Sequence, residues 1–326
     1  MSFANPNYTD ILATTIESRT RKLADNVTNN NAILKRLQAK GNIKTFSGGS
    51  KILQELTFAE NQNAGWYSGY DLLPVGVSDV ISAAEYDIKQ AAVPVIISGL
   101  EQLQNAGREQ MIDLMEGRMS VAESTIANLI TGGLYSDGTG AGGKELDGLE
   151  VAVPLAPETG DYGGIDSATY TFWRNYVVDS ASAADILGDW DTIWANLVRG
   201  ADRPDLIMCD SVAWTAYVGA LQAQQRFSNT NSGDAGFSSI KFMDADVVLD
   251  GGIYNGSLGT GAPTGTAFFL NCNYIHYRPH AARNMVPLSP NRRYATNQDA
   301  EVQIIAWAGN LTTSGRMFQG RWDMNA

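Results

Sequence analysis

The chain of 326 residues contains a glycine-rich segment, GTGAGGKE at 138–145, whose spacing could bind phosphate. Its glycines match both GxGxxG and GxxxxGK, patterns in which backbone N–H groups surround an anion. Such loops need a strand before them and the N-terminus of a helix after them. Here a long helical pattern precedes the segment, no helical pattern follows it, and Glu145 stands where a Ser or Thr would bind Mg²⁺. We therefore predict a flexible connector, with no nucleotide or other cofactor bound.

Histidine and cysteine are scarce, which limits the possible metal and nucleophile sites. His276 and His280 lie four residues apart in HYRPH, but Pro279 opposes the helix or strand that would align them. A metal site would need further ligands, and none is evident. Cys209 and Cys272 lie in apolar, strand-like surroundings and are predicted to be buried, reduced thiols.

Carboxylate pairs are the remaining candidates for catalysis. Asp189 with Asp191, and Asp244 with Asp246, could form an acid–base pair in principle. Helix caps and solvated loops are commoner roles for such residues. No GxSxG or HExxH pattern occurs in the chain. We predict that the protein is not an enzyme and has no catalytic residues, while a cytosolic enzyme using carboxylates in 189–250 stays open as an alternative.

Charge is unevenly distributed along the chain. The formal net charge is −12, yet residues 19–51 contain eight Lys and Arg residues against one Asp and no Glu. A basic segment on an acidic protein indicates a negatively charged partner, either nucleic acid or the acidic faces of sister subunits. A solvated helix surface is the alternative. The candidate contact residues are Arg19, Arg21, Lys22, Lys35, Arg36 and Lys51.

The pattern predicts helices at 9–24 and 31–40, the second ended by Gly41, and then two long strands at 51–60 and 85–98. Pro94 fits an edge strand. A two-stranded ribbon cannot bury a face by itself, so we expect it to lie on another molecule. Aromatic residues anchor interfaces well, and the segment between the strands contains Trp66, Tyr67 and Tyr70. A locally collapsed loop is the alternative for this segment.

The rest of the chain mixes helices and strands without regular βαβ alternation, which favours an α+β fold. A helix over 99–131 would be roughly 45 Å long. Asp189 and Asp210 are candidate N-caps of the two helices that follow it. Further helices are predicted at 189–200 and 211–224, strands at 203–210, 244–250, 266–271, 273–279 and 301–308, and a closing hairpin within 306–322.

Three segments resemble one family. GGIDSATYTFWRN at 163–175 is similar to a "TFWRN" segment of tailed-phage major capsid proteins with the Hong Kong 97 fold. Residues 191–221 resemble their helix–"PDLI"–strand–helix passage, and residues 297–322 resemble their closing strands with "WAGNL…QG". The order of these segments covers nearly the whole chain.

The resemblance implies five regions: an N-terminal arm at 1–46, an extended E-loop hairpin at 47–98, a peripheral domain with the spine helix at 99–149, an axial domain at 150–290, and closing strands at 291–326 that return to the peripheral domain. It implies a structural protein that self-assembles into hexamers and pentamers of an icosahedral virion capsid around double-stranded DNA, which it would contact without sequence preference. Portal, scaffolding and decoration proteins are further implied partners, and assembly would occur in the host bacterial cytoplasm.

Several alternatives remain within this resemblance. An encapsulin, a bacterial protein compartment with the same fold, would hold enzyme cargo instead of a genome. Some relatives cross-link subunits through an E-loop lysine, but Lys51 and Lys89 lie in the predicted strands rather than at the tip, so no cross-link is expected. About 46 residues precede the E-loop, which leaves no room for a fused assembly domain and implies a separate scaffolding protein or none. No apolar run reaches the roughly 20 residues needed to span a membrane, and no membrane partner is expected.

Overall fold

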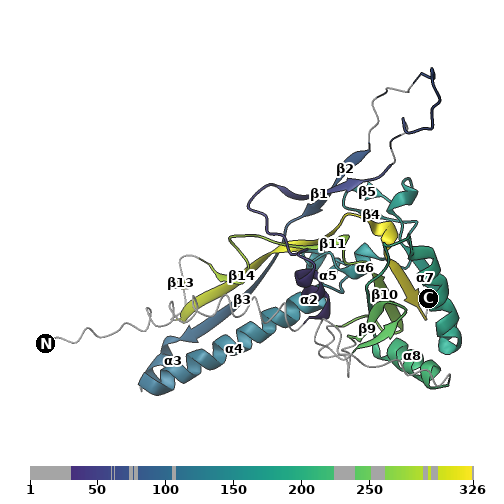
Figure 1. Cartoon of the computed structure of the whole chain (residues 1–326). Coiled ribbons are helices and arrows are strands. Elements are labelled where there is room, and N and C mark those ends of the chain that lie inside the picture. Colours follow the sequence, from purple (N-terminus) through teal and green to yellow (C-terminus); the bar gives the residue numbers. More distant parts are fainter. Residues whose placement is uncertain are drawn as a thin grey trace.

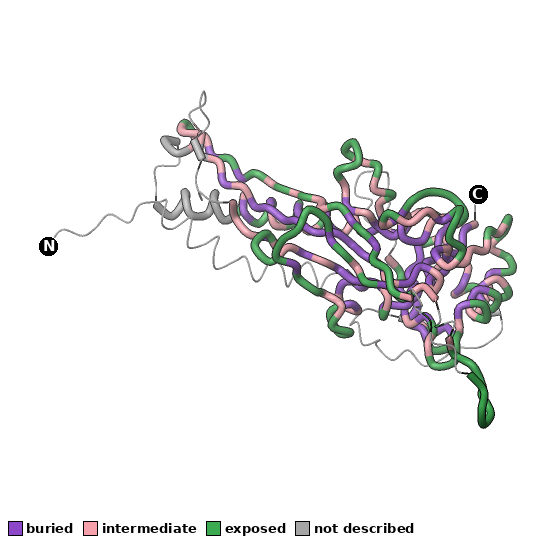
Figure 2. The backbone as a smooth tube through the Cα atoms, turned by 90° about the horizontal axis from the view of Figure 1, so that it is seen from above, coloured by how far each residue is buried: buried purple, intermediate pink, exposed green. Residues whose placement is uncertain are grey.

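The computed structural model describes residues 31–59, 61, 63–72, 76, 80–104, 108–223, 239–250, 261–288, 293–294 and 300–324. The helix predicted at 9–24, with Arg19, Arg21 and Lys22, lies outside the described residues. The described residues form an elongated sheet with a long helix beside it, a second sheet covered by helices, and a ribbon that projects from the body (Figure 1). The buried residues follow the two sheets (Figure 2).

The elongated sheet is organised around its longest strand, β14 (Ala300–Thr313). Strand β3 (Lys89–Ser98) pairs along one side of β14, from Lys89 opposite Gly309 to Ser98 opposite Ala300. The strands β11 (Ile275–Pro279), β12 (Val286–Pro287) and β13 (Arg293–Tyr294) pair with β14 as well.

Helices α3 (Gly99–Gln104) and α4 (Arg108–Gly133) lie beside this sheet (Figure 1). They confirm the helical pattern predicted at 99–131, apart from residues 105–107, which are not described. Met119, Ala122, Ile126 and Ile130 are buried at spacings of three and four, so one stripe of α4 faces the protein core.

The outer edge of β3 is blocked against pairing with a further strand. Pro94 has no N–H to offer, which confirms its predicted edge position. Arg118 of α4 donates to the carbonyl oxygen of Ile96, and Glu101 accepts a hydrogen bond from the backbone N–H of Ser98. Arg118 also pairs with Glu101, so the two charged side chains cover the edge together.

The second sheet has the order β6-β15-β10-β7-β9-β8. Its strands are β6 (Tyr176–Asp179), β7 (Leu206–Cys209), β8 (Ser239–Phe242), β9 (Ala245–Leu249), β10 (Thr266–Leu270) and β15 (Gly320–Asp323). Helices α7 (Ile186–Leu197) and α8 (Ser211–Ala223) pack on it. Trp190 of α7 stacks on Tyr217 of α8 with ring centroids 4.6 Å apart and meets Phe269 of β10 edge-on.

One of the two predicted caps is confirmed. The carboxylate of Asp210 accepts hydrogen bonds from the backbone N–H groups of Val212 and Ala213 at the start of α8. Asp189 is not a cap, because α7 already begins at Ile186. Its carboxylate lies in the first turn instead and accepts a hydrogen bond from Nε1 of Trp322, 3.0 Å away.

The closing hairpin predicted within 306–322 is wrong, because its two strands belong to different sheets. Strand β14 pairs with β3 and β11, whereas β15 pairs with β10 and β6. A 3-10 turn at Arg316–Phe318 separates them. Arg316 in this turn is buried, and its guanidinium donates to the carbonyl oxygens of Ala152, Val151 and Trp173 and to Oγ of Ser167. These contacts hold the turn between the sheets and direct the chain from one to the other.

The shorter elements include helix α2 (Ala32–Ala39), which confirms the prediction at 31–40. Asn31 caps it by accepting from the N–H of Leu34, and Gly41, with φ of +70°, ends it. The remaining elements are the helices α5 (Gly140–Gly143) and α6 (Leu149–Ala152), the short hairpin β4 (Asp161–Tyr162) with β5 (Ile165–Asp166), and the 3-10 turns η1 (Thr171–Trp173) and η2 (Ala183–Asp185).

Candidate inter-subunit surfaces

The projecting ribbon consists of β1 (Lys51–Thr57) and β2 (Ile81–Asp87), paired antiparallel with Lys51 opposite Asp87 and Thr57 opposite Ile81. The strand predicted at 85–98 is therefore divided: its beginning belongs to β2, and its larger part is β3 in the elongated sheet. Ile88 lies between the two strands and packs against the core. The strand prediction for 51–60 is confirmed for most of its length.

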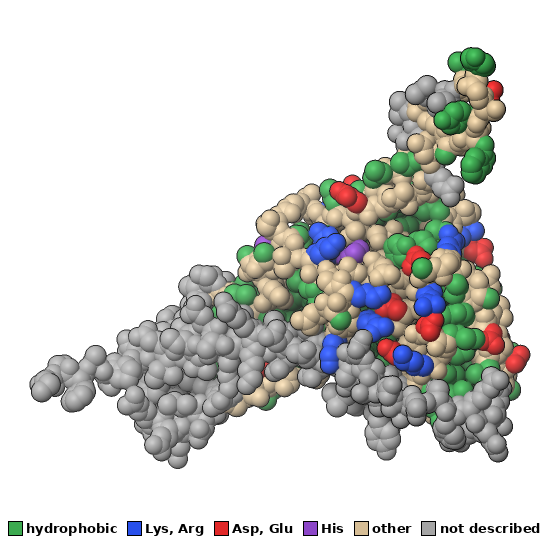
Figure 3. Space-filling model, viewed as in Figure 1, with side chains coloured by type: hydrophobic (Ala, Val, Ile, Leu, Met, Phe, Trp, Pro, Cys, Tyr) green, Lys and Arg blue, Asp and Glu red, His purple; other side chains and the backbone are tan. Residues whose placement is uncertain are grey.

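The tip of the ribbon is strongly apolar and fully open to solvent. Trp66 and Tyr70 are 105% and 106% exposed, Leu72 is 97% exposed, and Tyr67 is 67% exposed. Hydrophobic side chains gather at this tip, which extends away from the body (Figure 3). The tip has its own turn, in which the carboxylate of Asp71 accepts from the backbone N–H of Ser68. The aromatic side chains thus make no collapsed cluster with the body. Leu72 was not among the predicted contact residues, although it lies in the same segment.

The ribbon is fixed to the body at its root. Oε1 of Gln54 accepts hydrogen bonds from Nη1 of Arg278 at 3.2 Å and from Oγ1 of Thr312 at 3.3 Å. On the second strand, the hydroxyl of buried Tyr86 donates to the carbonyl oxygen of Thr313 at 3.0 Å. Both strands of the ribbon are therefore tied to β11 and β14.

A second group of contacts at the root includes Lys89. Its ammonium lies 3.4 Å from Oδ1 of Asp147 and donates to the carbonyl oxygen of Gly143. The side-chain amide of Asn310 donates to Oδ2 of Asp147 at 2.6 Å and to the carbonyl oxygen of Asp87 at 2.9 Å. The glycine-rich connector and Asp147 are thus held against β3 and β14, and Asn310 of β14 links them to Asp87 of the ribbon. Its short helix α5 and its contacts give it a structural role at the root.

The segment with the TFWRN pattern braces the ribbon from its other side. The carbonyl oxygen of Gly163 accepts a hydrogen bond from the N–H of Glu85 at 2.9 Å. A Cβ at Gly163, where φ is +64°, would meet the Cβ of Ala84 at 2.9 Å, so only glycine fits this approach. Trp173 in turn donates from Nε1 to the carbonyl oxygen of Tyr162, and the Tyr162 ring packs edge-on against Tyr86.

Lys51 lies at the base of the ribbon and is half exposed. Its ammonium is 2.9 Å from Oε2 of Glu85 on the opposite strand. The hydrogen bond and the charge of Glu85 raise the pKa of Lys51. Its predicted contact with another subunit stays a prediction.

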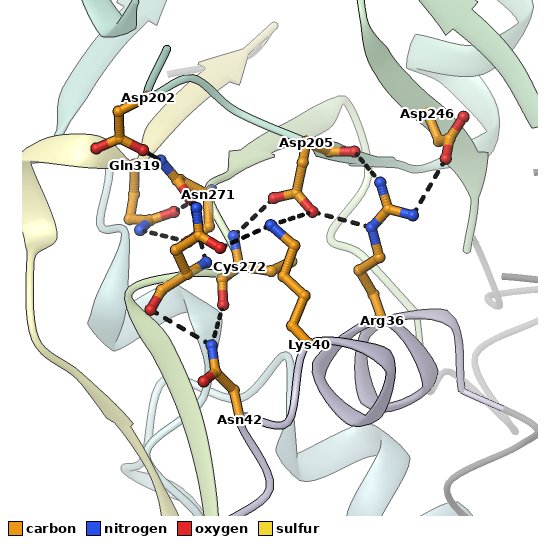
Figure 4. Close-up of polar contacts among 10 residues, drawn as sticks. Arg36, Lys40, Asn42, Asp202, Asp205, Asp246, Asn271, Cys272 and Gln319 are labelled. Atoms are coloured by element: carbon orange, nitrogen blue, oxygen red, sulfur yellow. Dashed lines mark hydrogen bonds and ion pairs between the residues drawn. The ribbon is translucent and has the colours of Figure 1, made fainter. Parts of the chain in front are cut away.

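Arg36 of the basic segment has acidic partners within its own chain (Figure 4). Its Nε lies 2.9 Å from Oδ2 of Asp205, and its Nη1 lies 3.5 Å from Oδ2 of Asp246. Lys40 also reaches Asp205, at 3.1 Å. Burial alone would lower the pKa of Arg36, but the hydrogen bond and the charge of Asp205 outweigh it and raise the pKa. Lys35 lies half-buried on the same helix. Contacts of Lys35 and Arg36 with other subunits stay predictions.

The same cluster ties helix α2 to the end of strand β10. The other oxygen of Asp205 accepts from the backbone N–H of Cys272 at 2.7 Å, and Nδ2 of Asn42 donates to the carbonyl oxygen of Cys272 at 2.6 Å (Figure 4). Burial raises the pKa of the Cys272 thiol and likewise that of Cys209, so both thiols are protonated and poor nucleophiles. The prediction of buried, reduced cysteines is confirmed.

The histidine and carboxylate candidates lie apart from one another in structural surroundings. His276 is 6% exposed, and burial, with the charges of Lys44 and Arg278, lowers its pKa to about 4. Asp244 pairs with Arg203 at 2.7 Å. In the part of the chain that the structure describes, no group of three or more His, Cys, Asp or Glu residues could hold a metal ion. No helix of that part is both long and apolar enough to cross a membrane.

A second open surface lies between β3 and α4 and was not predicted from the sequence. A groove of about 570 Å³ is lined by residues 93–96 of β3 and by Gly117, Arg118, Val121, Ala122 and Thr125 of α4. Val121 is 67% exposed and Ile96 is 48% exposed, so the rim is apolar and open. We call this the β3–α4 groove.

Comparison with known proteins gives matches among solved structures alone. No family model and no curated protein sequence matches the chain. The capsid asymmetric unit of cyanophage A-1(L) matches with a TM-score of 0.62 at 12% identity, over 88% of this chain and 92% of that chain. The capsid of a native GTA particle matches with a TM-score of 0.56 at 12% identity, over 89% and 90% of the two chains.

An encapsulin complex matches at a similar level. The holo-SrpI encapsulin complex of Synechococcus elongatus PCC 7942 has a TM-score of 0.55 at 9% identity, over 88% of this chain and 87% of that chain. These three matches cover 88–89% of this chain and 87–92% of the matched chains. The chain therefore has the α+β Hong Kong 97-like capsid fold.

Proposed function

We propose that this protein is the major capsid protein of a tailed phage, a structural subunit that assembles into hexamers and pentamers of an icosahedral head. One observation carries the proposal: a capsid-type fold presents a rigidly rooted ribbon whose tip exposes Trp66, Tyr67 and Tyr70 to solvent. Exposed aromatic side chains of this kind mark interaction sites. In an assembled shell, each ribbon would contact the neighbouring subunit.

The proposal extends to the contents and location of the particle. We place the chain in the virion capsid around double-stranded DNA, with assembly in the host bacterial cytoplasm. The overall acidic charge of −12 would keep the bulk of the shell from binding DNA tightly, while the basic segment offers sequence-independent phosphate contacts. A portal protein, a scaffolding protein and decoration proteins complete the proposed set of partners.

The domain organisation inferred from the resemblance is part of the proposal: an arm at 1–46, the E-loop at 47–98, and peripheral and axial domains meeting near 149 and 291. Within the proposed closing strands, β14 lies in the elongated sheet, whereas β15 pairs with β10 and β6 in the second sheet. The closing strands therefore divide between the two sheets.

Electron microscopy of the purified full chain tests the proposal. We expect closed shells, or rings of five and six copies, in the fractions that elute early from a size-exclusion column. A protein that remains a 35.1 kDa monomer at all concentrations, salt conditions and crowding levels, and also when co-expressed with the other head proteins, would contradict it.

An encapsulin-type compartment is the second candidate, because the encapsulin structure matches with a TM-score of 0.55. The two functions differ in what the shell contains. Particles purified from the native host should contain nuclease-protected DNA if the protein is a phage coat. Particles with a co-purifying protein cargo and no nucleic acid would favour the compartment. We propose a structural role without catalysis in either case.

A further inference from the structure

Two basic side chains lie side by side on strand β11, close to the root of the ribbon. His276 and Arg278 are two residues apart in this strand, so their side chains lie on the same face of the sheet. Thr312 of β14 is paired with His276 and therefore belongs to that face as well. Two positions along a strand span roughly 7 Å, a spacing that one ligand can bridge.

A lysine completes this group from the other edge of β11. The chain before the ribbon runs parallel to β11, with Phe46 bridged to His280, and the two rings meet edge-on with centroids 4.9 Å apart. Because side chains alternate along both segments, Lys44 lies on the same face as His276 and Arg278. We call Lys44, His276 and Arg278 the β11 basic cluster.

The β11 basic cluster has no carboxylate partner in the part of the chain that the structure describes. None of the ion pairs there includes Lys44 or Arg278. Burial alone lowers the pKa of Arg278, and burial with the charges of Lys44 and Arg278 lowers the pKa of His276. Burying positive charge without a counter-charge is costly. An anion from outside the chain would supply that counter-charge.

The guanidinium of Arg278 keeps the donors that oxyanions recognise. Its Nη1 donates to Oε1 of Gln54 at 3.2 Å, whereas its Nε has no hydrogen-bond partner among the described residues. Nε and Nη2 point to the same side of a guanidinium, and such a pair can bind two oxygens of one carboxylate or phosphate. The contact with Gln54 therefore fixes the guanidinium and leaves this pair for a ligand.

His276 offers another donor on the same face. Its side chain is only 6% exposed, and its Nδ1 has no hydrogen-bond partner among the described residues. A protonated imidazole donates from both nitrogens, so Nδ1 could then donate to an oxyanion. The negative charge of that ligand would offset the charges of Lys44 and Arg278, which oppose protonation of His276.

We propose that the β11 basic cluster binds a phosphate-type oxyanion, held by Lys44, His276 and Arg278. The nitrogens of His276 and Arg278 are enclosed, which favours a small free ion such as inorganic phosphate over the phosphate of a nucleic-acid chain. Its entry requires rotation of the half-buried Arg278 side chain. The inference goes beyond the proposed function, because all three residues belong to one chain and need no assembly.

The bound oxyanion would connect three separate parts of the chain. Lys44 belongs to the segment before the ribbon, Arg278 belongs to β11, and Gln54 of β1 is bonded to Arg278. A ligand that binds only the folded protein stabilises it in proportion to its occupancy. Phosphate would therefore stabilise the root of the ribbon.

Equilibrium dialysis of the full chain against radiolabelled inorganic phosphate tests the inference. Sodium chloride keeps the ionic strength constant, so that screening does not vary between samples. We expect saturable binding that approaches one phosphate per chain. Arg278→Gln should weaken this binding by about tenfold or more, because the bidentate contact is lost. Lys44→Gln, at an exposed position, should weaken it by about threefold.

Arg283→Gln is the matched control for Arg278→Gln. Arg278 and Arg283 each donate from Nη1 to Oε1 of a glutamine at 3.2 Å, but Arg283 is exposed. Arg283→Gln should leave the affinity for phosphate unchanged. The absence of saturable binding to the unmodified protein, or an equal loss in the two arginine variants, would overturn the inference. If circular dichroism shows that Arg278→Gln is unfolded, Lys44→Gln decides, and an unchanged affinity in that variant would overturn it.

Competition by sulfate tests the part played by His276. Sulfate keeps its charge between pH 6 and pH 8, and lysine and arginine side chains stay protonated in this range. Lys44 and Arg278 are the charged groups that act on His276, while Thr312 and Gln54 do not titrate. Sulfate should therefore displace phosphate more strongly at pH 6, where His276 binds a proton together with the anion. Equal competition at both pH values would contradict this part of the site.

Competition by short duplex DNA identifies the source of the phosphate group. We expect DNA to leave the labelled phosphate bound, because a small free ion is the ligand. Displacement by DNA at an equal concentration of phosphate groups would contradict this assignment and identify the nucleic-acid backbone as the source.

Discussion

Nε of Arg36 lies 2.9 Å from Oδ2 of Asp205, although the two residues are 169 positions apart in the chain. The pair joins helix α2, which directly follows the segment outside the described residues, to the loop before strand β7 of the second sheet. The side chains of Arg36 and Asp205 are 15% and 16% exposed, so solvent screens this ion pair less than it screens a surface pair.

Arg36→Met should lower the free energy of unfolding by about 1–3 kcal/mol, because it leaves the carboxylates of Asp205 and Asp246 without their guanidinium partner. Urea denaturation followed by fluorescence measures this change. Lys44→Met, at an exposed position near the end of the same segment, is the control and should change the free energy by less than about 0.5 kcal/mol. Equal effects of the two variants would contradict the structural role of the ion pair.

His276 should make the protein less stable in mild acid. Its pKa is about 4 in the folded protein, compared with 6.5 for an unperturbed histidine, so the unfolded chain binds the proton first as the pH falls. Stability attributable to His276 is therefore complete above pH 6.5 and is lost progressively as the pH falls toward 4, by roughly 3 kcal/mol at most. His276→Gln should flatten this part of the stability profile.

The measurement is the free energy of unfolding at intervals between pH 4 and pH 7.5. Buried carboxylates also titrate in this range, so the informative quantity is the difference between the unmodified protein and His276→Gln. His280→Gln is the companion variant, because His280 is half-buried and lies four residues away. A difference curve that is the same for both variants would contradict the assignment to His276.

Arg316→Lys should be strongly destabilising, by about 3–5 kcal/mol. The planar guanidinium of Arg316 serves three carbonyl oxygens and the hydroxyl of Ser167 in a buried site, and an ammonium cannot reach all of them. Burial lowers the pKa of Arg316, which means that the buried positive charge is not itself stabilising. The stabilisation by Arg316 therefore comes from its hydrogen bonds. Thermal unfolding monitored by circular dichroism measures the effect, with Arg283→Lys at an exposed position as the reference.

The double variant Trp66→Ser with Tyr70→Ser should separate assembly from folding. Both side chains are fully exposed, so the midpoint of thermal unfolding of the monomer should stay nearly unchanged. The yield of shells or rings by light scattering should fall at least tenfold, because the tip loses its aromatic anchors. Tyr170→Ser, which removes an exposed aromatic side chain away from the tip, should leave the yield intact. A loss of particles in both cases would argue against a specific role of the tip.

Sequence patterns predicted the elements whose conformation is decided by residues close to one another in the chain. Helix α2 was predicted from its apolar spacing and from Gly41, and helix α8 from its pattern after Asp210. The exposed aromatic tip was also predicted, because Trp66 and Tyr67 lie between two strands that cannot enclose them.

Errors arose where distant contacts decide the outcome. The sequence 306–322 has the pattern of a hairpin, but buried Arg316 and Trp322 find partners in other parts of the chain and place the two strands in different sheets. Asp205, the acidic partner of Arg36, is 169 positions away, so the sequence around Arg36 does not indicate this contact. The β3–α4 groove likewise depends on how a helix packs beside an edge strand, which no spacing rule describes.

The blocked edge of β3 has a consequence for a protein that must meet many copies of itself at high concentration. Open strand edges join to one another without regard to side-chain shape, and this is the first step toward fibres and amorphous precipitates. Because Pro94, Arg118 and Glu101 close this edge, collisions between copies at β3 cannot be captured by the backbone. Copies then bind one another at β3 only where their side chains are complementary. A copy bound in the wrong position can therefore dissociate and bind again before the particle closes.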